Sequence, residues 1–362
     1  MSAAKHIAIL CSRLDLPGGI ERAVVNTANL FAEKGQQVTL IILDETGNSY
    51  YAIGPGIKKI QQPLSFGITH EGNMISRKIR LLSDVLRLRK IFKQVKPDII
   101  ISSEYPFSIA AVLTGAKKYA KVYAWEHHHH GWIDMNKFWT LLRNKAYPRL
   151  HGIICLNNDE AKYYSEFTRT FVVPNAVKNE SSGISDLNSH SILSVGWLIP
   201  RKGIDMLLKV ATAILKKHPG WTWKIIGDGE MKADVLNCIS SEKLEGRLIL
   251  QQPTGADLSE EYINSSLFIL TSRFEAFPMV LLEAQSFGIP CISFDCPSGP
   301  ADIIIDQVNG LLIEKENVGQ MIIAIDELIV DEEKRKELGR NAIRDIDRFS
   351  LNSIYKKWSD IF

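Results

Sequence analysis

The sequence predicts an α/β protein with two doubly wound domains, each a parallel β-sheet covered by helices. Three observations support this fold class. The chain has 362 residues, which corresponds to about two domains at roughly 100–200 residues each. Its composition, 45% hydrophobic and 23% charged, is that of a globular protein with a large core. Short apolar, β-branched runs alternate with amphipathic segments along the whole chain.

The apolar runs are predicted as strands of parallel sheets, because they read as buried on both faces and are separated by helical patterns. In the first half they cover residues 5–12, 37–44, 98–104, 122–127, 152–156 and 171–173. In the second half they cover 192–198, 223–227, 247–251, 267–272, 291–295 and 310–314. Two such series predict two Rossmann-like domains.

The domain boundary is predicted near residues 173–176, where the sequence reads VPNA. The polar stretch 178–190 follows, in which Gly, Ser and Asn cluster and apolar periodicity stops. We therefore expect an N-terminal domain of residues 1–176 and a second domain of residues 177–350. In the last predicted helix, about 351–362, the apolar residues lie on one face; they are Ile354, Trp358, Ile361 and Phe362.

Charge differs between the two halves. Residues 1–175 carry 23 Lys and Arg against 14 Asp and Glu, whereas residues 176–362 carry 20 against 27. The totals of 43 and 41 exclude a polybasic coat or an acidic tail over the whole protein. The positive first half indicates contact with an anionic surface, and nothing points to nucleic acid.

Cysteine usage and the chain start predict a cytoplasmic protein. The five cysteines are scattered and contain no CxxC pair, which argues against a disulfide framework or a zinc site. The first residues are too polar for a signal peptide, and no run of about 18 apolar residues could span a membrane.

Two turns after predicted strands are candidate anion sites. Gly18 and Gly19 follow the first strand and begin a helix, where glycine allows a ligand close to the backbone and the helix N-terminus attracts phosphate. No GxGxxG occurs, and an ordinary tight turn is an equal alternative. Arg201 and Lys202 follow the strand 192–198 and could hold a diphosphate; a solvated loop is the alternative.

The most specific segment is residues 275–283, EAFPMVLLE, which follows the strand 267–272 and enters an apolar helix. Glu275 lies at the mouth of this helix and Glu283 two turns inside it. Ionised carboxylates suit sugar and ribose hydroxyls as acceptors, and the N–H groups between them can bind phosphate. The alternative, two solvated helix charges, is weakened because Glu283 lies in an apolar stretch.

Four histidines, residues 127–130, end the strand 122–127. Consecutive residues do not share a face, so a four-ligand metal site is not expected. One imidazole, His127 by register, can present a hydrogen bond or act near neutral pH, and a surface cluster is the alternative.

Residues 77–96 form a basic amphipathic segment with eight Lys and Arg and one acidic residue, Asp84. Ile79, Leu82, Leu86 and Ile91 fall near helical spacing. We expect this helix to lie on anionic lipid, and a solvated helix covering the first sheet is the alternative.

The only Asp-x-Asp, Asp345-Ile346-Asp347, lies far from any turn between a strand and a helix. A divalent cation that bridges a diphosphate needs carboxylates in the cleft. No metal or other cofactor is therefore expected. Arg201, Lys202 and helix N-termini would instead neutralise the negative charge of the diphosphate.

Taken together, these segments resemble the glycosyltransferase family 4 enzymes of the GT-B fold, over nearly the whole chain. The resemblance rests on the turn at 18–19, the histidine after the fifth strand, VPNAV, SVGWLIPRKGIDMLL, IIGDG and TSRFEAFPMVLLEAQSFGIPCISFDCPSGPADIIIDQVNGLLIE. It implies a central cleft between the domains and a C-terminal helix that crosses back to the first. Trp197 departs from the family, which often has arginine there, and this leaves Arg201 to complete a cation pair.

The resemblance also implies site roles. Glu275 would contact the hydroxyls of the donor sugar and Glu283 the donor ribose, while Arg201 and Lys202 would neutralise the diphosphate. His127 would lie near the reacting sugar. Further donor contacts would come from the turn at Gly18 and Gly19, from the nucleobase segment Gln252, Pro253 and Thr254, and from Phe277, Pro278, Met279 and Val280, of which Pro278 has no N–H to give.

The implied reaction is a retaining, metal-independent transfer by front-face displacement. A hexose or N-acetylhexosamine would pass from a UDP-sugar to a saccharide acceptor on the N-terminal domain, in O-antigen, lipopolysaccharide or capsule synthesis. A lipid-linked acceptor at the inner face of the cell membrane fits the basic helix. Two alternatives stay open, a GT-B sugar-nucleotide epimerase and a non-catalytic sugar-nucleotide-binding scaffold.

Overall fold

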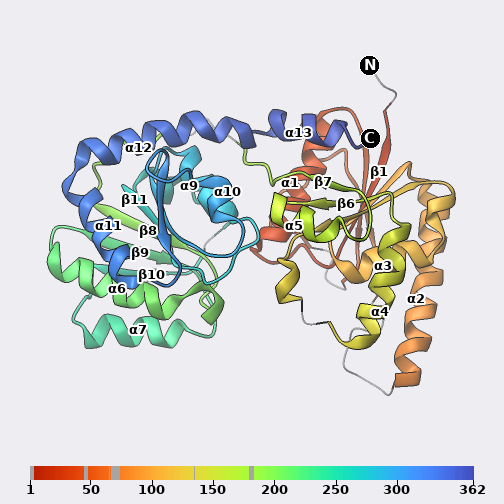
Figure 1. The fold of residues 1–362 in the computed structure, drawn as a ribbon, viewed down its shortest axis with the longest axis horizontal. Helices are drawn as coiled ribbons and strands as arrows, with labels where there is room; N and C mark the ends of the chain where they lie inside the picture. The colour runs from red at the N-terminus through yellow and green to blue at the C-terminus, as the bar shows by residue number, and fades with distance from the viewer. Residues whose placement is uncertain are drawn as a thin grey trace. The chain divides into compact units, whose positions relative to one another are not determined.

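The computed structural model describes residues 4–44, 48–64, 66, 74–133, 135–178, 183–253 and 255–362, with the backbone alone at 74–77. The chain divides into two compact units: unit 1 comprises Met1–Ala176 and Leu351–Phe362, and unit 2 comprises Val177–Ser350. Each unit is built on one parallel sheet (Figure 1). The α/β class with two Rossmann-like sheets is therefore confirmed.

The sheet of unit 1 has the order β3-β2-β1-β4-β5-β6-β7, and every neighbouring pair is parallel. Because the chain moves outward in one direction from β1 and in the other from β4, the carboxyl ends of β1 and β4 flank a topological switch point. The strands are β1 His6–Cys11, β2 Gln37–Ile42, β3 Lys58–Gln61, β4 Ile99–Ser102, β5 Lys121–Glu126, β6 Gly152–Cys155 and β7 Thr170–Val172.

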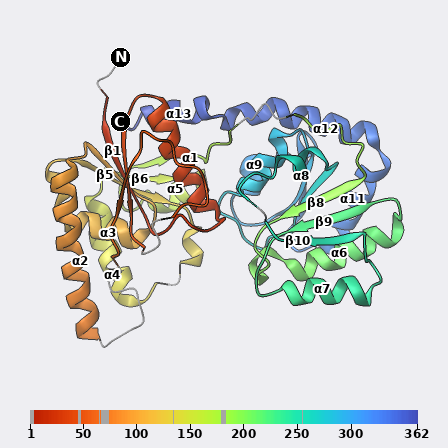
Figure 2. The same cartoon turned by 180° about the vertical axis from the view of Figure 1, so that it is seen from behind.

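Helices cover both faces of this sheet (Figures 1 and 2). Helices α2, α3 and α4 cover one face and contribute to a core that includes Leu88, Phe92 and Ile109. On the other face, Phe31 of α1 packs edge-on against Trp358 of α13, with ring centroids 5.2 Å apart. The helices are α1 Gly19–Glu33, α2 Met74–Val95, α3 Tyr105–Leu113, α4 Lys137–Ala146, α5 Asn158–Tyr164 and α13 Leu351–Ser359, with short 3-10 turns η1 Ala116–Lys118, η2 His130–Trp132 and η3 Tyr147–Arg149.

Unit 2 repeats the plan with the order β10-β9-β8-β11-β12-β13, again parallel throughout, so its switch point lies between β8 and β11. Helices α6 and α7 lie along one face of the sheet, and α9 and α12 lie on the other (Figures 1 and 2). The strands are β8 Ser191–Val195, β9 Thr222–Ile226, β10 Leu248–Gln251, β11 Leu267–Leu270, β12 Cys291–Asp295 and β13 Gly310–Glu314. The helices are α6 Ile204–Lys217, α7 Lys232–Ser241, α8 Ser259–Ile263, α9 Met279–Ser286, α10 Pro300–Ile303, α11 Val318–Val330 and α12 Glu332–Asp345, with η4 Pro200–Lys202 and η5 Ile346–Phe349.

Helix α2 exposes an apolar stripe. Its sequence pattern alone did not distinguish this stripe from the apolar side that faces the core. Ile79, Leu82 and Leu86 are 64%, 63% and 56% exposed. Ile91, expected on the same face, is buried in the core together with Leu81, Val85, Leu88 and Phe92. The helix therefore has a core-facing side and a second, exposed apolar side. In the described residues, no helix is both long and apolar enough to cross a membrane.

Candidate functional site

The loops after β8 and β11 bring a cation and a carboxylate together at the switch point of unit 2. Nζ of Lys202 donates to Oε1 of Glu275 at 2.5 Å, although 73 residues separate them in sequence. Oγ of Ser272 donates to the same oxygen at 2.6 Å. Both side chains are largely buried, with 18% of Lys202 and 10% of Glu275 exposed. Parallel pairing of β8 and β11 makes this meeting possible, since it places both following loops at one edge of the sheet.

A glycine lets the two loops approach closely. Gly203 ends η4 with φ of 66°, in the left-handed region that glycine favours. A Cβ there would lie 2.0 Å from the backbone oxygen of Thr271. The Thr271 hydroxyl also donates to the Lys202 carbonyl at 3.1 Å. The backbone that carries Lys202 is thus held against the loop that leads to Glu275.

The pair retains donors and acceptors for a ligand. An ammonium group has three N–H donors, and within the described part of the chain Nζ of Lys202 bonds to Glu275 alone. Oε2 of Glu275 accepts no hydrogen bond from a described residue. The arrangement suits a ligand that carries both an anionic group and hydroxyl donors.

The segment after Glu275 is fixed by the loop that follows β12. Oγ of Ser298 donates to the Glu275 carbonyl at 2.9 Å. Gly299, with φ of 94°, passes so close that a Cβ would lie 3.0 Å from the Ala276 carbonyl oxygen. Helix α9 then starts after Pro278, and its N-terminal turn offers backbone N–H groups to an anion. Phe277, Pro278 and Met279 are buried, and Val280 is half-buried.

Glu283 lies in the second turn of α9 and is 4% exposed. The Tyr262 hydroxyl donates to Oε2 of Glu283 at 2.8 Å, and the Tyr262 ring stacks on Phe287 at 5.3 Å. Tyr262 is a residue that the sequence analysis missed. Because α8 and α9 come together only through the fold, nothing in the local pattern marked it as a partner of Glu283.

The remaining predicted donor residues lie at the ends of neighbouring strands. The Arg201 carbonyl accepts from the backbone N–H of Arg273 at 2.9 Å, while the Arg201 residue itself is exposed. Gln252, directly after β10, donates to Oδ2 of Asp228 at 3.2 Å, and Pro253 follows it. Thr254 lies outside the described residues.

In unit 1, the predicted glycine turn carries a carboxylate. Gly18 precedes α1, and a Cβ on it would lie 2.0 Å from Oε2 of Glu21, so the Glu21 side chain covers this position. Gly19 has open space, with nothing within 4 Å of an added Cβ. Burial raises the pKa of Glu21, and it also raises the pKa of Glu104, which follows β4 across the switch point. Neither glutamate was singled out from the sequence.

His127 follows β5 directly and is 5% exposed. Its ring lies 4.2 Å from that of Trp125, and Nε2 has no hydrogen-bond partner among the described residues. Burial, reinforced by the neighbouring His128, lowers the pKa of His127 to about 3. The imidazole is therefore neutral near pH 7 and can donate or accept a hydrogen bond, but it does not titrate there.

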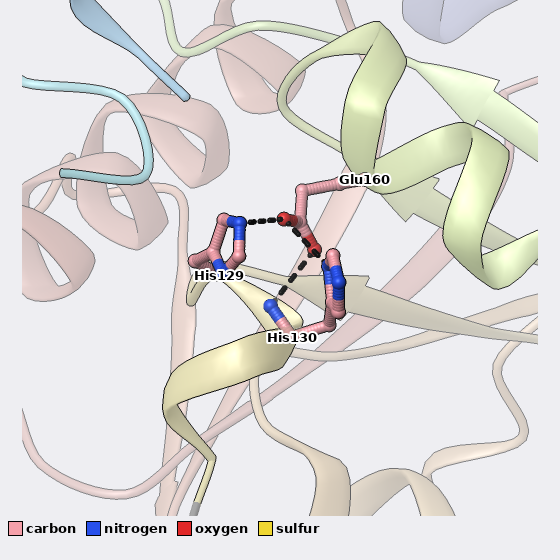
Figure 3. Close-up of side chains that lie close together, drawn as sticks. All are labelled: His129, His130 and Glu160. Carbon is pink, nitrogen blue, oxygen red and sulfur yellow. Dashed lines mark hydrogen bonds and ion pairs between the residues drawn. The ribbon is translucent and has the colours of Figure 1, made fainter. Parts of the chain in front are cut away.

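Two of the four histidines meet Glu160 of α5, and both rings point toward its carboxylate (Figure 3). Nδ1 of His130 lies 3.1 Å and Nε2 of His129 3.7 Å from Oε1 of Glu160. These are metal-ligand types. However, the Gly131 amide donates to Nδ1 of His129, which puts the proton of the neutral ring on Nε2, the atom a metal would need. We therefore interpret the cluster as a support that ties the loop after His127 to α5.

Comparison with known proteins agrees with this architecture. Residues 17–181 match the family described as Glycosyltransferase Family 4, and residues 178–345 match Glycosyl transferases group 1. An uncharacterized glycosyltransferase of Haemophilus influenzae is 26% identical, over 99% of each chain. A Campylobacter jejuni protein is 26% identical over 94% of each chain and is named GalNAc-alpha-(1->4)-GalNAc-alpha-(1->3)-diNAcBac-PP-undecaprenol alpha-1,4-N-acetyl-D-galactosaminyltransferase.

Among solved structures, a mutant of S. aureus TarM in complex with Fondaparinux, alpha-GlcNAc-glycerol and UDP superposes with a TM-score of 0.81. It is 17% identical, with 99% of each chain covered, so this likeness concerns the fold. The two family matches together span residues 17–345 and follow the order of the two sheets. The chain belongs to the family 4 and group 1 glycosyltransferases and has their GT-B fold.

Proposed function

We propose that the chain is a retaining glycosyltransferase that moves a hexose or N-acetylhexosamine from a UDP-sugar to a lipid-linked saccharide in cell-surface polysaccharide synthesis. The observation that carries the proposal is the Lys202–Glu275 pair at the switch point of unit 2, beside the N-terminus of α9. Such a pair matches a ligand with hydroxyl donors and a diphosphate. The UDP in the TarM complex and the PP-undecaprenol in the name of the Campylobacter relative support the donor and the acceptor class.

In this proposal the cationic residues bind the diphosphate and the carboxylates bind the hydroxyl groups of the donor. Lys202 and Arg201 bear the positive charge that stabilises the departing diphosphate, helped by the N–H groups at the start of α9. Glu275 accepts hydrogen bonds from hydroxyls of the donor sugar through Oε2, and Glu283, held by Tyr262, accepts from the ribose. Gln252 and Pro253 follow β10 and border the nucleobase. No step in this scheme uses a metal ion.

The transfer step follows from this division. The bond between the anomeric carbon and the UDP oxygen breaks, and the acceptor hydroxyl forms a new bond to that carbon from the same face. The hydroxyl proton passes to a phosphate oxygen of the departing UDP, so that charge and atoms balance. Neutral His127 lies on unit 1, where we place the acceptor. The turn at Gly18 and Gly19 of the same unit lets donor and acceptor come close. Catalysis rests on positioning and on stabilisation of the leaving group.

Transfer assays with a panel of UDP-sugars and polyprenyl-linked saccharides test the proposal. We expect Lys202→Ala and Glu275→Ala each to lose at least 100-fold in turnover, on the order of 3 kcal/mol, while circular dichroism stays native. Lys209→Ala, an exposed lysine on α6, is the matched control and should keep full activity. Normal turnover in both site variants, or release of an epimerised UDP-sugar without acceptor, would contradict the proposal.

We also propose that α2 holds the protein on an anionic inner membrane surface. Its exposed apolar stripe, Ile79, Leu82 and Leu86, continues along the same helix face into Lys90 and Lys93. Apolar insertion beside basic residues is the pattern of a helix that lies in a lipid interface.

Vesicle sedimentation tests the α2 proposal. Changing Ile79, Leu82 and Leu86 to Ser should abolish binding to vesicles that contain phosphatidylglycerol without lowering stability, since these side chains are exposed. Ile323→Ser/Val330→Ser removes equally exposed apolar groups from unit 2 and should leave binding unchanged. Equal binding of both variants to anionic and neutral vesicles would refute the membrane role.

A further inference from the structure

A cavity of about 380 Å³ opens in unit 1 at the amino ends of the strands. Lys5 precedes β1, Asp98 precedes β4, Lys121 begins β5 and His151 precedes β6. These four strands are neighbours in the parallel sheet, so their amino ends share one edge. Gly18 and His127 follow the carboxyl ends of β1 and β5, which places the cavity at the opposite edge of the sheet from them.

The cavity is strongly basic. Lys5, Lys117, Lys118 and Lys121 line it, and none of the four forms an ion pair with a residue that the structure describes. Its one acidic lining residue, Asp98, already accepts a hydrogen bond from the His6 backbone N–H at 2.8 Å. Four lysines against one carboxylate at a concave surface create a positive potential that attracts anions.

The pKa of His151 is sensitive to this potential, and its ring offers a hydrogen-bond donor in a fixed direction. Burial lowers the pKa of His151, and the charges of Lys117 and Lys121 lower it further. Nδ1 accepts a hydrogen bond from the Val122 amide at 3.0 Å. The proton of the neutral ring therefore sits on Nε2, which makes no hydrogen bond to the described residues and can donate to a ligand.

We propose that this cavity binds a phosphate group, with the lysines neutralising its charge and Nε2 of His151 donating to one of its oxygens. A phosphomonoester carries up to two charges on three oxygens, which matches several ammonium groups and one fixed N–H. The cavity also has room for the group that bears the phosphate. The same chemistry is offered by a soluble phosphate ester and by the headgroup of a phosphatidic acid. Either ligand would leave the donor site of unit 2 untouched.

Proton NMR of the histidine rings in the 362-residue chain tests the site with inorganic phosphate as the probe. His151→Gln identifies the His151 signal. We expect phosphate to raise the pKa of His151, because an anion cancels the effect of Lys117 and Lys121. Lys117→Gln/Lys121→Gln should weaken phosphate binding at least tenfold, whereas Lys59→Gln/Lys209→Gln, with the same loss of charge elsewhere, should leave it unchanged.

Vesicles distinguish the two sources of phosphate. If the lysine variant also loses binding to phosphatidic acid vesicles but not to phosphatidylglycerol vesicles, the lipid phosphomonoester is the ligand. If vesicle binding is unchanged while phosphate still shifts His151, the ligand is soluble. A His151 signal that does not respond to phosphate, or responds equally in the lysine variant, would overturn the proposal.

Discussion

Replacement of Gly203 by alanine perturbs the contact on which the candidate site depends. Gly203 joins η4 to α6 with φ of 66°, and an added Cβ would lie 2.0 Å from the Thr271 carbonyl oxygen. The Thr271 oxygen belongs to the backbone, so it cannot rotate away from the added Cβ as the end of a flexible side chain could. The loop that carries Lys202 must therefore move away from the loop that carries Glu275.

The expected loss in the free energy of unfolding has two parts, backbone strain and steric overlap. The same substitution at a second glycine, Gly246, measures the strain alone. Gly246 has φ of 72° but nothing within 4 Å of an added Cβ. Gly246→Ala should cost about 1–2 kcal/mol, the strain of a left-handed alanine. Gly203→Ala should cost a further 1–3 kcal/mol for overpacking, and so lose about 2–5 kcal/mol in total.

Urea unfolding followed by circular dichroism measures both free energies, and UDP-sugar turnover measures the functional effect. We expect the Gly203 variant to unfold at lower urea than the Gly246 variant and to lose at least tenfold in turnover, while the Gly246 variant keeps its activity. Equal destabilisation in the two variants, with turnover intact in both, would refute the argument that close approach of these loops builds the site.

Two further perturbations test buried polar groups, one in each unit. In unit 1, burial raises the pKa of Glu126 from 4.5 to about 7, and Tyr147 donates to it at 2.5 Å. The folded state therefore keeps a proton that the unfolded state releases above pH 4.5, so this stabilisation is complete below pH 4.5 and lost as pH rises through 7. We expect the free energy of unfolding of Glu126→Gln, measured in urea, to rise relative to that of the natural protein by on the order of 3 kcal/mol between pH 4.5 and 8. Parallel curves of unfolding free energy against pH for the two proteins would contradict this. In unit 2, Tyr262→Phe removes the hydroxyl that donates to buried Glu283 and should lower the free energy of unfolding by about 1–3 kcal/mol and weaken UDP binding, as measured by calorimetry; unchanged values for both would show that Tyr262 does not hold this carboxylate.

Much of the fold was predictable because buried parallel strands leave continuous apolar runs. All twelve predicted strands occur. Their ends differ from the predicted ones by at most three residues, as in β8, which ends at Val195 instead of Leu198. The strand β3, Lys58–Gln61, was missed. It lies at the sheet edge with mostly exposed residues, so its sequence KKIQ carries no apolar run.

The site was predictable only in part, because its partners come together through the sheet order. Sequence marked Lys202 and Glu275 separately, but their pairing depends on β8 and β11 being neighbours. Ser272, Glu104 and Glu160 were missed for the same reason, since a single polar residue near a strand end is common. The neutral state of His127 depends on burial, which local sequence does not specify.

Isothermal titration of UDP in buffer containing EDTA tests the central claim most directly. If protein cations hold the diphosphate at the switch point of unit 2, the natural protein should bind UDP without metal, Lys202→Ala should bind at least tenfold more weakly, and the Lys209→Ala control should match the natural protein. Equal UDP affinity in Lys202→Ala and the control, or binding that disappears in EDTA, would contradict the account.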